Sequence, residues 1–155
     1  MTPSTLLNLT DVATRNEAIV EDFFNALEAL DVDAFGALMT EEAIYYNPMW
    51  IGSEIFTSPQ EAGRDQIVSL FRIMPDVLSG VEITDRQYDQ AADPNKMFVR
   101  TATAFTFRKD GYVYRNDILH VFEFEDGKVS SWTEFMDTVS RDKAYGRPGI
   151  FGEER

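Results

Sequence analysis

The chain has 155 residues, enough for one domain with a substantial core and too few for two comfortable ones. It contains no cysteine, which excludes a disulfide framework, a thiolate nucleophile and a cysteine metal site. Its formal net charge of −13 disfavours nucleic acid and anionic membranes as partners, because like charges repel. No apolar run reaches membrane-spanning length, and residues 1–5 lack the basic start of a signal peptide, so we expect a cytoplasmic protein.

Three helices are predicted in the first half of the chain. Apolar residues between positions 19 and 30 follow helical spacing and mark the first helix. A short second helix starts at Asp31 or Asp33. The third runs from about residue 63 to residue 74, and Pro75 stops it.

Strands follow the helices. A first strand is predicted at residues 41–47, and alternating patterns predict four more at residues 81–90, 97–108, 112–124 and 128–138. Asp-Gly pairs separate the last three strands, which is a strong hairpin signal.

Helices followed by an antiparallel sheet indicate an α+β fold. We expect a single domain over residues 1–155, with its core at about 12–138 and a turn-rich tail at 139–155. A cone-shaped curved antiparallel sheet, closed by three N-terminal helices, is the architecture that fits this order. The concave face of such a cone is either filled with side chains or left as a pocket.

His120 is the only histidine, and it lies in the middle of the strand predicted at residues 112–124. Side chains alternate between the two faces of a strand, and we expect the more aromatic face to point inward. Tyr45 and Asn47, at the end of the first strand, can point the same way. The expected inward set is Thr101, Thr103, Phe105, Asn116, Ile118, His120, Phe122, Trp132, Glu134 and Met136.

The polar members of this set also have plainer interpretations. His120 can be a core histidine satisfied by one hydrogen bond. Glu134 can be an exposed carboxylate at a strand end, and Asn47 with Pro48 can be a simple turn. Burial beside a carboxylate would favour the charged form of His120, whereas burial among aromatic rings would favour the neutral form.

The segment at residues 48–62 is irregular but rich in apolar side chains. Loops are usually polar and superficial, so an apolar loop of this length indicates a lid over a cavity or part of an interface. Its aromatic members, Trp50 and Phe56, are the candidates for contact with a ligand.

Several local strings are shared with one family. They are Phe23-Phe24-Asn25-Ala26-Leu27, Asp31-Val32-Asp33-Ala34-Phe35, Tyr45-Tyr46-Asn47-Pro48, Gly63-Arg64-Asp65, and the run from His120 to Val129 followed by Trp132-Thr133-Glu134. With the order of elements, they resemble the nuclear transport factor 2-like superfamily in its SnoaL-like branch, over roughly residues 12–138. That branch includes polyketide cyclases, ketosteroid isomerases and limonene epoxide hydrolase.

The resemblance to limonene epoxide hydrolase implies roles for individual residues. Tyr45 and Asn47 match the tyrosine and asparagine that help to hold the attacking water in that enzyme. Glu134 falls where the enzyme has a carboxylate at the same water. Thr101 and Thr103 stand where it has an arginine and a second aspartate, so its charged triad is absent.

The resemblance to ketosteroid isomerase implies a different set of matches. Asn47 replaces the basic aspartate, and a carboxamide cannot abstract a proton. Phe23 replaces the tyrosine of the oxyanion hole, and His120 stands where a protonated aspartic acid would be. The resemblance also implies a homodimer through the outer face of the sheet, where Leu119 and Val121 would suit an interface better than open water.

Our leading hypothesis is a cofactor-independent general acid–base enzyme of cyclase, isomerase or epoxide-hydrolase type, acting on a small apolar polyketide-, terpenoid- or steroid-like compound. Glu134 or His120 would be the base, with the other as its partner or as the acid. Tyr45, Asn47 and Asn116 would orient the substrate or stabilise an enolate-like oxygen. The expected substrate-binding residues are Phe23, Trp50, Phe56, Thr101, Thr103, Phe105, Ile118, Phe122, Trp132 and Met136.

The alternative hypothesis is a non-catalytic small-molecule-binding or dimeric assembly module on the same fold. It is motivated by the missing acids at the family's catalytic positions. We expect no metal, because one histidine with scattered acids lacks a ligand spacing. We also expect no nucleotide cofactor, because the glycines of residues 146–149 are typical of tail turns.

Overall fold

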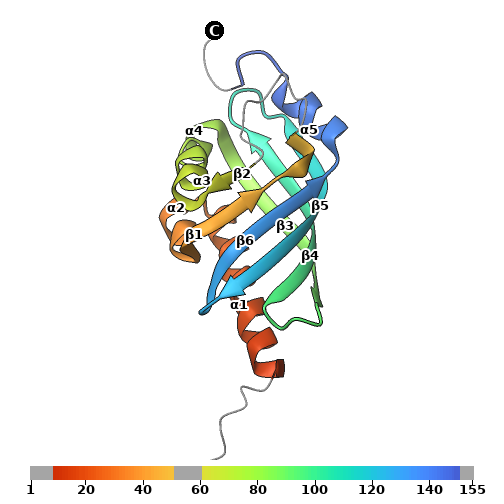
Figure 1. Cartoon of the computed structure of the whole chain (residues 1–155). Coiled ribbons are helices and arrows are strands. Elements are labelled where there is room, and N and C mark those ends of the chain that lie inside the picture. The colour runs from red at the N-terminus through yellow and green to blue at the C-terminus, as the bar shows by residue number, and fades with distance from the viewer. Residues whose placement is uncertain (1–8, 51–60, 151–155) are drawn as a thin grey trace, which may run out of the picture.

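A computed structural model describes residues 9–50 and 61–150 of the chain. Within these two stretches, six strands form one curved sheet in the order β2-β1-β6-β5-β4-β3 (Figure 1). The strands are β1 (Met39–Tyr46), β2 (Glu61–Gly63), β3 (Leu78–Gln90), β4 (Lys96–Phe107), β5 (Val113–Glu125) and β6 (Lys128–Met136). The α+β fold with a curved sheet is therefore confirmed.

The central part of the sheet is the predicted antiparallel meander. Strand β5 alternates between buried and exposed residues along most of its length, which is the pattern of a strand with one solvated face. A two-residue loop joins β5 to β6, and its residues Asp126 and Gly127 have φ values of 50° and 77°. Positive φ at both positions is what a type I′ hairpin turn requires.

One pairing departs from the all-antiparallel prediction. Strand β1 runs parallel to β6, with Tyr45 beside Trp132, so the sheet is mixed. The two strands are far apart in sequence, and local alternation carries no information about the direction of such a pair. The parallel pairing brings the end of β1 next to the aromatic and acidic residues of β6.

Helices cover the face of the sheet that carries His120. They are α1 (Leu9–Glu28), α2 (Val32–Ala37), α3 (Arg64–Phe71) and α4 (Met74–Val77), and a 3-10 turn, η1 (Pro48–Trp50), follows β1. In Figure 1, α1 runs behind the strands and α2, α3 and α4 gather on one side. The predicted third helix ends at Phe71, before Pro75, and Pro75 does not stop it but lies in the first turn of a separate helix, α4, where a missing N–H costs nothing.

An aromatic cluster joins α1 and α2 to the sheet. The ring of Phe23 lies 4.9 Å from that of Phe35, 5.3 Å from that of Phe122 and 5.0 Å from that of Trp132, all edge to face. All four side chains are at most 2% exposed. The cluster therefore fills one end of the concave face with closely packed side chains. The rest of that face is not filled by this cluster.

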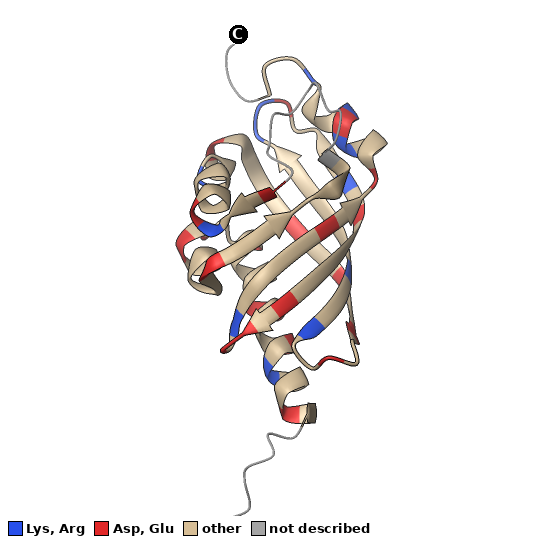
Figure 2. Ribbon diagram, viewed as in Figure 1, with Lys and Arg blue, Asp and Glu red and all other residues tan. Residues whose placement is uncertain are grey.

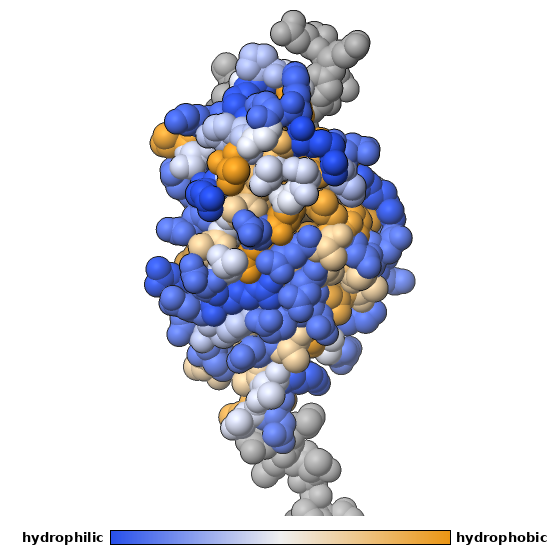
Figure 3. Space-filling view, turned by 180° about the vertical axis from the view of Figure 1, so that it is seen from behind, coloured by the Kyte–Doolittle hydropathy of each residue, from blue (hydrophilic) through white to orange (hydrophobic). Residues whose placement is uncertain are grey.

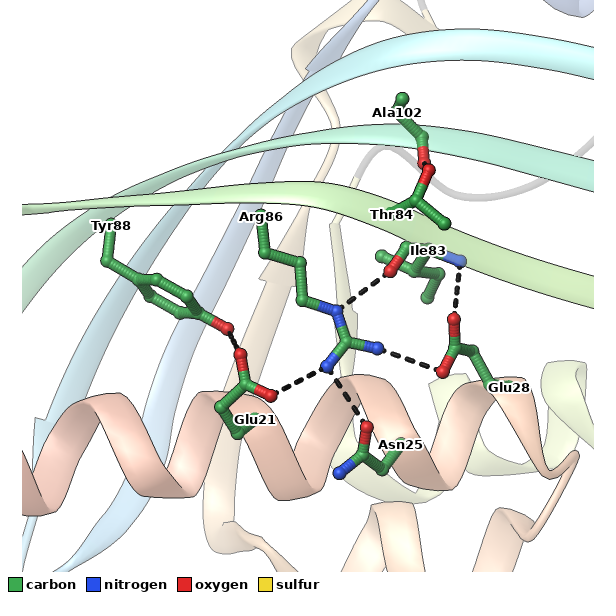
Figure 4. A network of polar contacts seen from close by, with 8 residues as sticks. All are labelled: Glu21, Asn25, Glu28, Ile83, Thr84, Arg86, Tyr88 and Ala102. Carbon is green, nitrogen blue, oxygen red and sulfur yellow. Dashed lines mark hydrogen bonds and ion pairs between the residues drawn. The ribbon is translucent and has the colours of Figure 1, made fainter.

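A polar network fixes α1 against β3 (Figure 4). The Arg86 guanidinium donates to Glu21 and to Glu28, at 2.9 Å each, and Glu28 also accepts from the backbone N–H of Ile83 at 2.7 Å. The Tyr88 hydroxyl donates a hydrogen bond to Glu21. Strand β3 carries a register shift between Thr84 and Gln87, and the intervening bulge lets Arg86 reach the helix.

The segment expected to be a turn-rich tail contains a further helix, α5 (Thr138–Tyr145). Asp137 caps it by accepting from the backbone N–H of Val139 at 2.9 Å. Beyond the helix, the Arg147 guanidinium lies 3.8 Å from the ring centre of Tyr112 and forms a 2.7 Å ion pair with Asp110. The chain after β6 is thus fastened over the sheet.

The surface reflects the acidic composition. Figure 2 shows carboxylates spread over helices, strands and turns instead of gathered in one patch. Seen from behind, hydrophilic side chains dominate, and apolar side chains reach the surface in patches, one of them right of the centre (Figure 3). No helix within residues 9–50 or 61–150 is both long enough and apolar enough to cross a membrane.

Candidate functional site

A cavity lies between the concave face of the sheet and the helices. Its atom-free space is about 710 Å³ with the mouth included, and the centres of water molecules can occupy about 80 Å³ of it. Helices α1, α3, α4 and α5 and strands β1, β3, β4, β5 and β6 contribute to its walls. Of the predicted site residues, those that line it are Tyr45, Thr103, Phe105, Ile118, His120, Trp132, Glu134 and Met136.

His120 is fully hydrogen-bonded. The indole N–H of Trp132 donates to its Nδ1 at 3.1 Å, and its Nε2 lies 3.0 Å from the hydroxyl oxygen of Thr101. An indole nitrogen can only donate, so Nδ1 must carry a lone pair and Nε2 must carry the proton. The ring is therefore held in its neutral form, as a donor to Thr101.

Burial acts in the same direction on His120. The side chain is 3% exposed and packs against the ring of Phe24 at 5.0 Å. Removal from water lowers the pKa of His120 to about 3. Of the two opposing effects considered from sequence, burial among aromatic rings prevails, so this histidine is uncharged at neutral pH.

Glu134 is a buried carboxyl group that faces the cavity. It pairs directly with His120 across β5 and β6 and is 8% exposed. Among the residues that the structure describes, none forms a hydrogen bond or an ion pair with it, and burial raises the pKa of Glu134 to about 8. At neutral pH Glu134 is mostly a carboxylic acid and can donate a proton. Because its pKa is close to neutral pH, a fraction of the carboxylate, which can accept a proton, is also present.

Tyr114 adds a hydrogen-bond donor that the sequence analysis did not select. Its hydroxyl oxygen accepts from Nδ2 of Asn116 at 2.6 Å, and its ring lines the cavity. Burial raises the pKa of Tyr114, so the phenol keeps its proton. Within residues 9–50 and 61–150, no acceptor takes the hydroxyl hydrogen of Tyr114, and an oxygen of a bound molecule can receive it.

Asn116 holds Tyr114 in place. Its Nδ2 also donates to the backbone carbonyl of Asp137 at 2.8 Å, and its Oδ1 accepts from the Asp137 N–H at 3.0 Å. The amide is thereby tied to the junction between β6 and α5, and it does not belong to the cavity wall. We infer that Asn116 positions the phenol of Tyr114 and the start of α5.

Helix α5 supplies two further residues of the wall, Arg141 and Tyr145. Arg141 is 2% exposed, donates to the backbone carbonyl of Met49 at 2.6 Å and forms a 2.8 Å ion pair with Asp142. Burial raises the pKa of Tyr145. The spacing of Arg141, Ala144 and Tyr145 is helical, and this signal would have revealed an inward face of the tail.

The sequence of residues 20–132 matches the family model of the SnoaL-like domain. The chain belongs to the SnoaL-like family. The resemblance seen in the local strings is thereby confirmed.

Solved structures agree with this assignment. A Bacillus subtilis protein provisionally assigned as an isomerase has a TM-score of 0.75 at 19% identity, covering 90% of this chain and 96% of its own. An LEH-like epoxide hydrolase from M. tuberculosis has a TM-score of 0.66 at 23% identity, with 85% and 90% covered. A protein of Xanthomonas campestris, provisionally assigned as a polyketide cyclase, has a TM-score of 0.70 at 16% identity, with 88% and 99% covered.

At these identities the similar structures establish the fold of the SnoaL-like domain and leave the reaction to be argued from the site. No curated protein matches the sequence.

The remaining predicted residues lie around the SnoaL-like cavity. Asn47 is fully buried, donates to the Tyr45 hydroxyl at 3.0 Å and accepts from the Met49 N–H at 3.0 Å, so it shapes the end of β1. Phe23 and Phe122 belong to the aromatic cluster below the cavity. Phe56 and the side chain of Trp50 lie outside the described residues.

Proposed function

We propose that this SnoaL-like protein is a cofactor-independent enzyme in which Glu134 is the general acid–base group for a small apolar compound. One observation carries the proposal: Glu134 is a buried carboxyl group without a partner among the described residues, and it faces an apolar cavity. Burial of an unpaired carboxyl group destabilises the folded protein, and such groups are found most often in active sites.

The pKa of Glu134 suits proton transfer in both directions. At about 8 it lies close to neutral pH, where a group can accept and return a proton with little loss of driving force. In a cyclase- or isomerase-type step, the carboxylate would remove a proton from a carbon next to a carbonyl. The electron pair would move to the carbonyl oxygen, and the new carboxylic acid would return the proton to another carbon.

Tyr114 is the proposed hydrogen-bond donor to the oxygen of the substrate. Its hydroxyl accepts a 2.6 Å hydrogen bond from Asn116, which strengthens the phenol as a donor. A donor that is already oriented stabilises negative charge as it develops on an enolate or an opened epoxide oxygen. We assign Tyr114 this role, and Tyr45, which also lines the cavity, the role of a neighbour that shapes the substrate's position.

His120 is assigned a positioning role and not that of the base. Its Nδ1 lone pair is occupied by Trp132, and its Nε2 proton points to Thr101. Protonation at Nδ1 would make the N–H of His120 face the indole N–H of Trp132, so the hydrogen bond between them would be lost. Between the two candidate bases from the sequence, the geometry favours Glu134.

Turnover of Glu134→Gln tests the proposal. A panel of cyclic ketones and epoxides is assayed by NMR for deuterium uptake from heavy water and for diol formation. Loss of the acid–base group is expected to lower the rate about 100-fold or more on any substrate that the natural protein converts. Glu123→Gln, on the exposed face of β5, is the matched control. Equal turnover of Glu134→Gln and the natural protein would refute the role of Glu134.

A non-catalytic binding protein is the competing function, and one observation favours it. Several polar side chains near the cavity are hydrogen-bonded to other groups of the protein and are not available to a substrate, namely those of Asn47, Asn116 and His120. If the cavity only binds, Glu134→Gln lowers affinity and no member of the panel is converted by either protein.

We also propose that the protein is a homodimer through the outer face of the sheet. Leu119 and Phe135 pair across β5 and β6 on that face and are 37% and 41% exposed. Apolar side chains next to each other on a strand surface suit an interface better than water. Sedimentation is expected to give a dimer for the natural chain and a monomer for Leu119→Glu; a monomeric natural chain would refute the dimer.

A further inference from the structure

A second hollow adjoins the cavity between the C-terminal end of α1, helix α4 and strand β3. Its atom-free space is about 370 Å³ with the opening to solvent included, and the centres of water molecules can occupy about 30 Å³ of it. It shares five wall residues with the main cavity: Leu27, Phe71, Met74, Ile83 and Phe105. We call the second hollow the side branch.

The shared residues border both spaces and come from several elements. Leu27 and Met74 come from helices α1 and α4, and Phe105 comes from β4 and packs edge to face on Tyr114 at 5.7 Å. Methionine is flexible and adapts to irregular gaps, and leucine changes rotamer without movement of the backbone. A bound molecule can therefore pass from the main cavity into the side branch by displacing side chains alone.

The chemistry of the side branch restricts what it can hold. Its wall is apolar, except for Asp31. That carboxylate is exposed and accepts from the backbone N–H of Ala34 at 3.0 Å as the cap of α2, so it is committed to the helix. The space for water centres is less than half of that in the main cavity, so the side branch takes a smaller group than the main cavity does.

We propose that the side branch is a subsite for an unbranched hydrocarbon chain of the substrate. Its oxygen-bearing part would lie in the main cavity, at Glu134 and Tyr114, and its chain would extend past Met74 toward Val81 and Leu30. This inference rests on the proposed function in one respect, which is that the oxygen of the substrate lies at Glu134 and Tyr114. The substrate class is therefore an amphiphile: a carbonyl, hydroxyl or epoxide group that carries an alkyl or acyl chain.

Binding of 4-alkylphenols tests the subsite without any need for turnover. The phenol offers one oxygen and a ring to the main cavity, and the chain length is varied from ethyl to octyl. Binding is followed by calorimetry and by tryptophan fluorescence, to which Trp132 in the cavity wall contributes. Affinity is expected to rise about fourfold for each added methylene until the branch is full, the fold-change that follows from complete burial of a CH₂ group.

Two variants fill the side branch from opposite walls. Val81→Phe acts from β3 and Ala26→Leu acts from α1, and neither residue lines the main cavity. Each is expected to weaken 4-octylphenol at least about tenfold and to change 4-ethylphenol by less than about twofold, because only the longer chain reaches the branch. Ile118→Phe, in the wall of the main cavity alone, is the matched control and is expected to weaken both compounds.

Equal affinity of the natural protein for the short and long compounds would overturn the subsite. So would a chain-length dependence that survives in both Val81→Phe and Ala26→Leu, each checked for cooperative unfolding. Glu134→Gln separates this inference from the proposed function. That variant is expected to keep the chain-length dependence, so unchanged turnover with the dependence retained would count against the acid–base role alone.

Discussion

The buried carboxyl group of Glu134 makes the stability of the protein depend on pH in a direction that one substitution can isolate. Its pKa in the folded protein is about 8, raised by burial from an ordinary value of 4.5. In the unfolded chain the group has its ordinary value. The folded state therefore binds the proton more tightly, and the folded state loses stability as pH rises from 4.5 to about 8.

The size of the loss follows from the two pKa values. Below 4.5 the group is protonated in both states and contributes no difference. Between the two values each pH unit costs about 1.4 kcal/mol, so the whole interval from 4.5 to about 8 amounts to roughly 5 kcal/mol. Above pH 8 the loss is complete.

Urea unfolding of the natural protein and of Glu134→Gln measures the effect directly. Every other titrating group is common to both proteins, so the difference between their unfolding free energies reports Glu134 alone. The glutamine variant is expected to gain several kcal/mol relative to the natural protein between about pH 5 and about pH 9. Two curves that stay parallel over this interval would refute the raised pKa and, with it, the electrostatic basis of the site.

Three further predictions concern the framework around the site. Trp132→Phe removes the donor to Nδ1 of His120 and leaves a buried acceptor unpaired, so urea unfolding is expected to show a loss of about 1–3 kcal/mol. Arg86→Met leaves two partly buried carboxylates without their cation, and a loss of about 2–3 kcal/mol is expected, smaller at high salt. Gly36→Ala places a Cβ 2.9 Å from Cγ2 of Val68, so the Val68 side chain or the packing of α2 on α3 must shift, and a loss of about 1–3 kcal/mol is expected in thermal unfolding.

Matched variants serve as controls for these predictions. Gly80→Ala adds a Cβ in ordinary contact with Thr106, at 3.8 Å, and is expected to be nearly neutral. Arg100→Met, on the exposed side of β4, tests whether loss of any arginine destabilises the protein. If the control variants lose as much stability as Gly36→Ala and Arg86→Met, the specific contacts are not the cause.

Local sequence patterns were sufficient to predict the strands that carry the site residues and the face on which these residues lie. Alternation in β5 predicted that His120 points inward, and the same rule applied to β6 predicted that Glu134 points inward beside it. The Asp126–Gly127 turn sets the pairing of Glu125 with Lys128, and a register shift between Glu123 and Phe124 then brings His120 opposite Glu134. The face that each side chain occupies follows from local alternation, whereas the pairing of His120 with Glu134 depends on this shift, which the sequence did not mark.

Features that depend on distant segments escaped the same reasoning. The parallel pairing of β1 with β6 joins strands separated by most of the chain. The inward turn of Arg86 depends on a bulge at Asp85, with φ of 50°, which the alternating pattern does not mark. Helix α5 was hidden by the glycines and the proline after it, which dominate the composition of residues 139–155.

The chemistry of the site also needed distances. Sequence placed His120 near both a carboxylate and aromatic rings and left its charge open. The 3.1 Å bond from Trp132 decides the matter, because it fixes which nitrogen carries the proton. The choice of Glu134 over His120 as the acid–base group depends on this one contact and on the missing partner of the carboxyl group in the described part of the chain.

The proposed role of Glu134 requires this residue to be a carboxylic acid at neutral pH. Infrared difference spectra between the natural protein and Glu134→Gln, recorded across the pH range, follow the carbonyl stretch of this one protonated group. We expect the band to persist at neutral pH and to disappear with a midpoint near 8. A band that is lost near the ordinary value of 4.5 would contradict this role of Glu134.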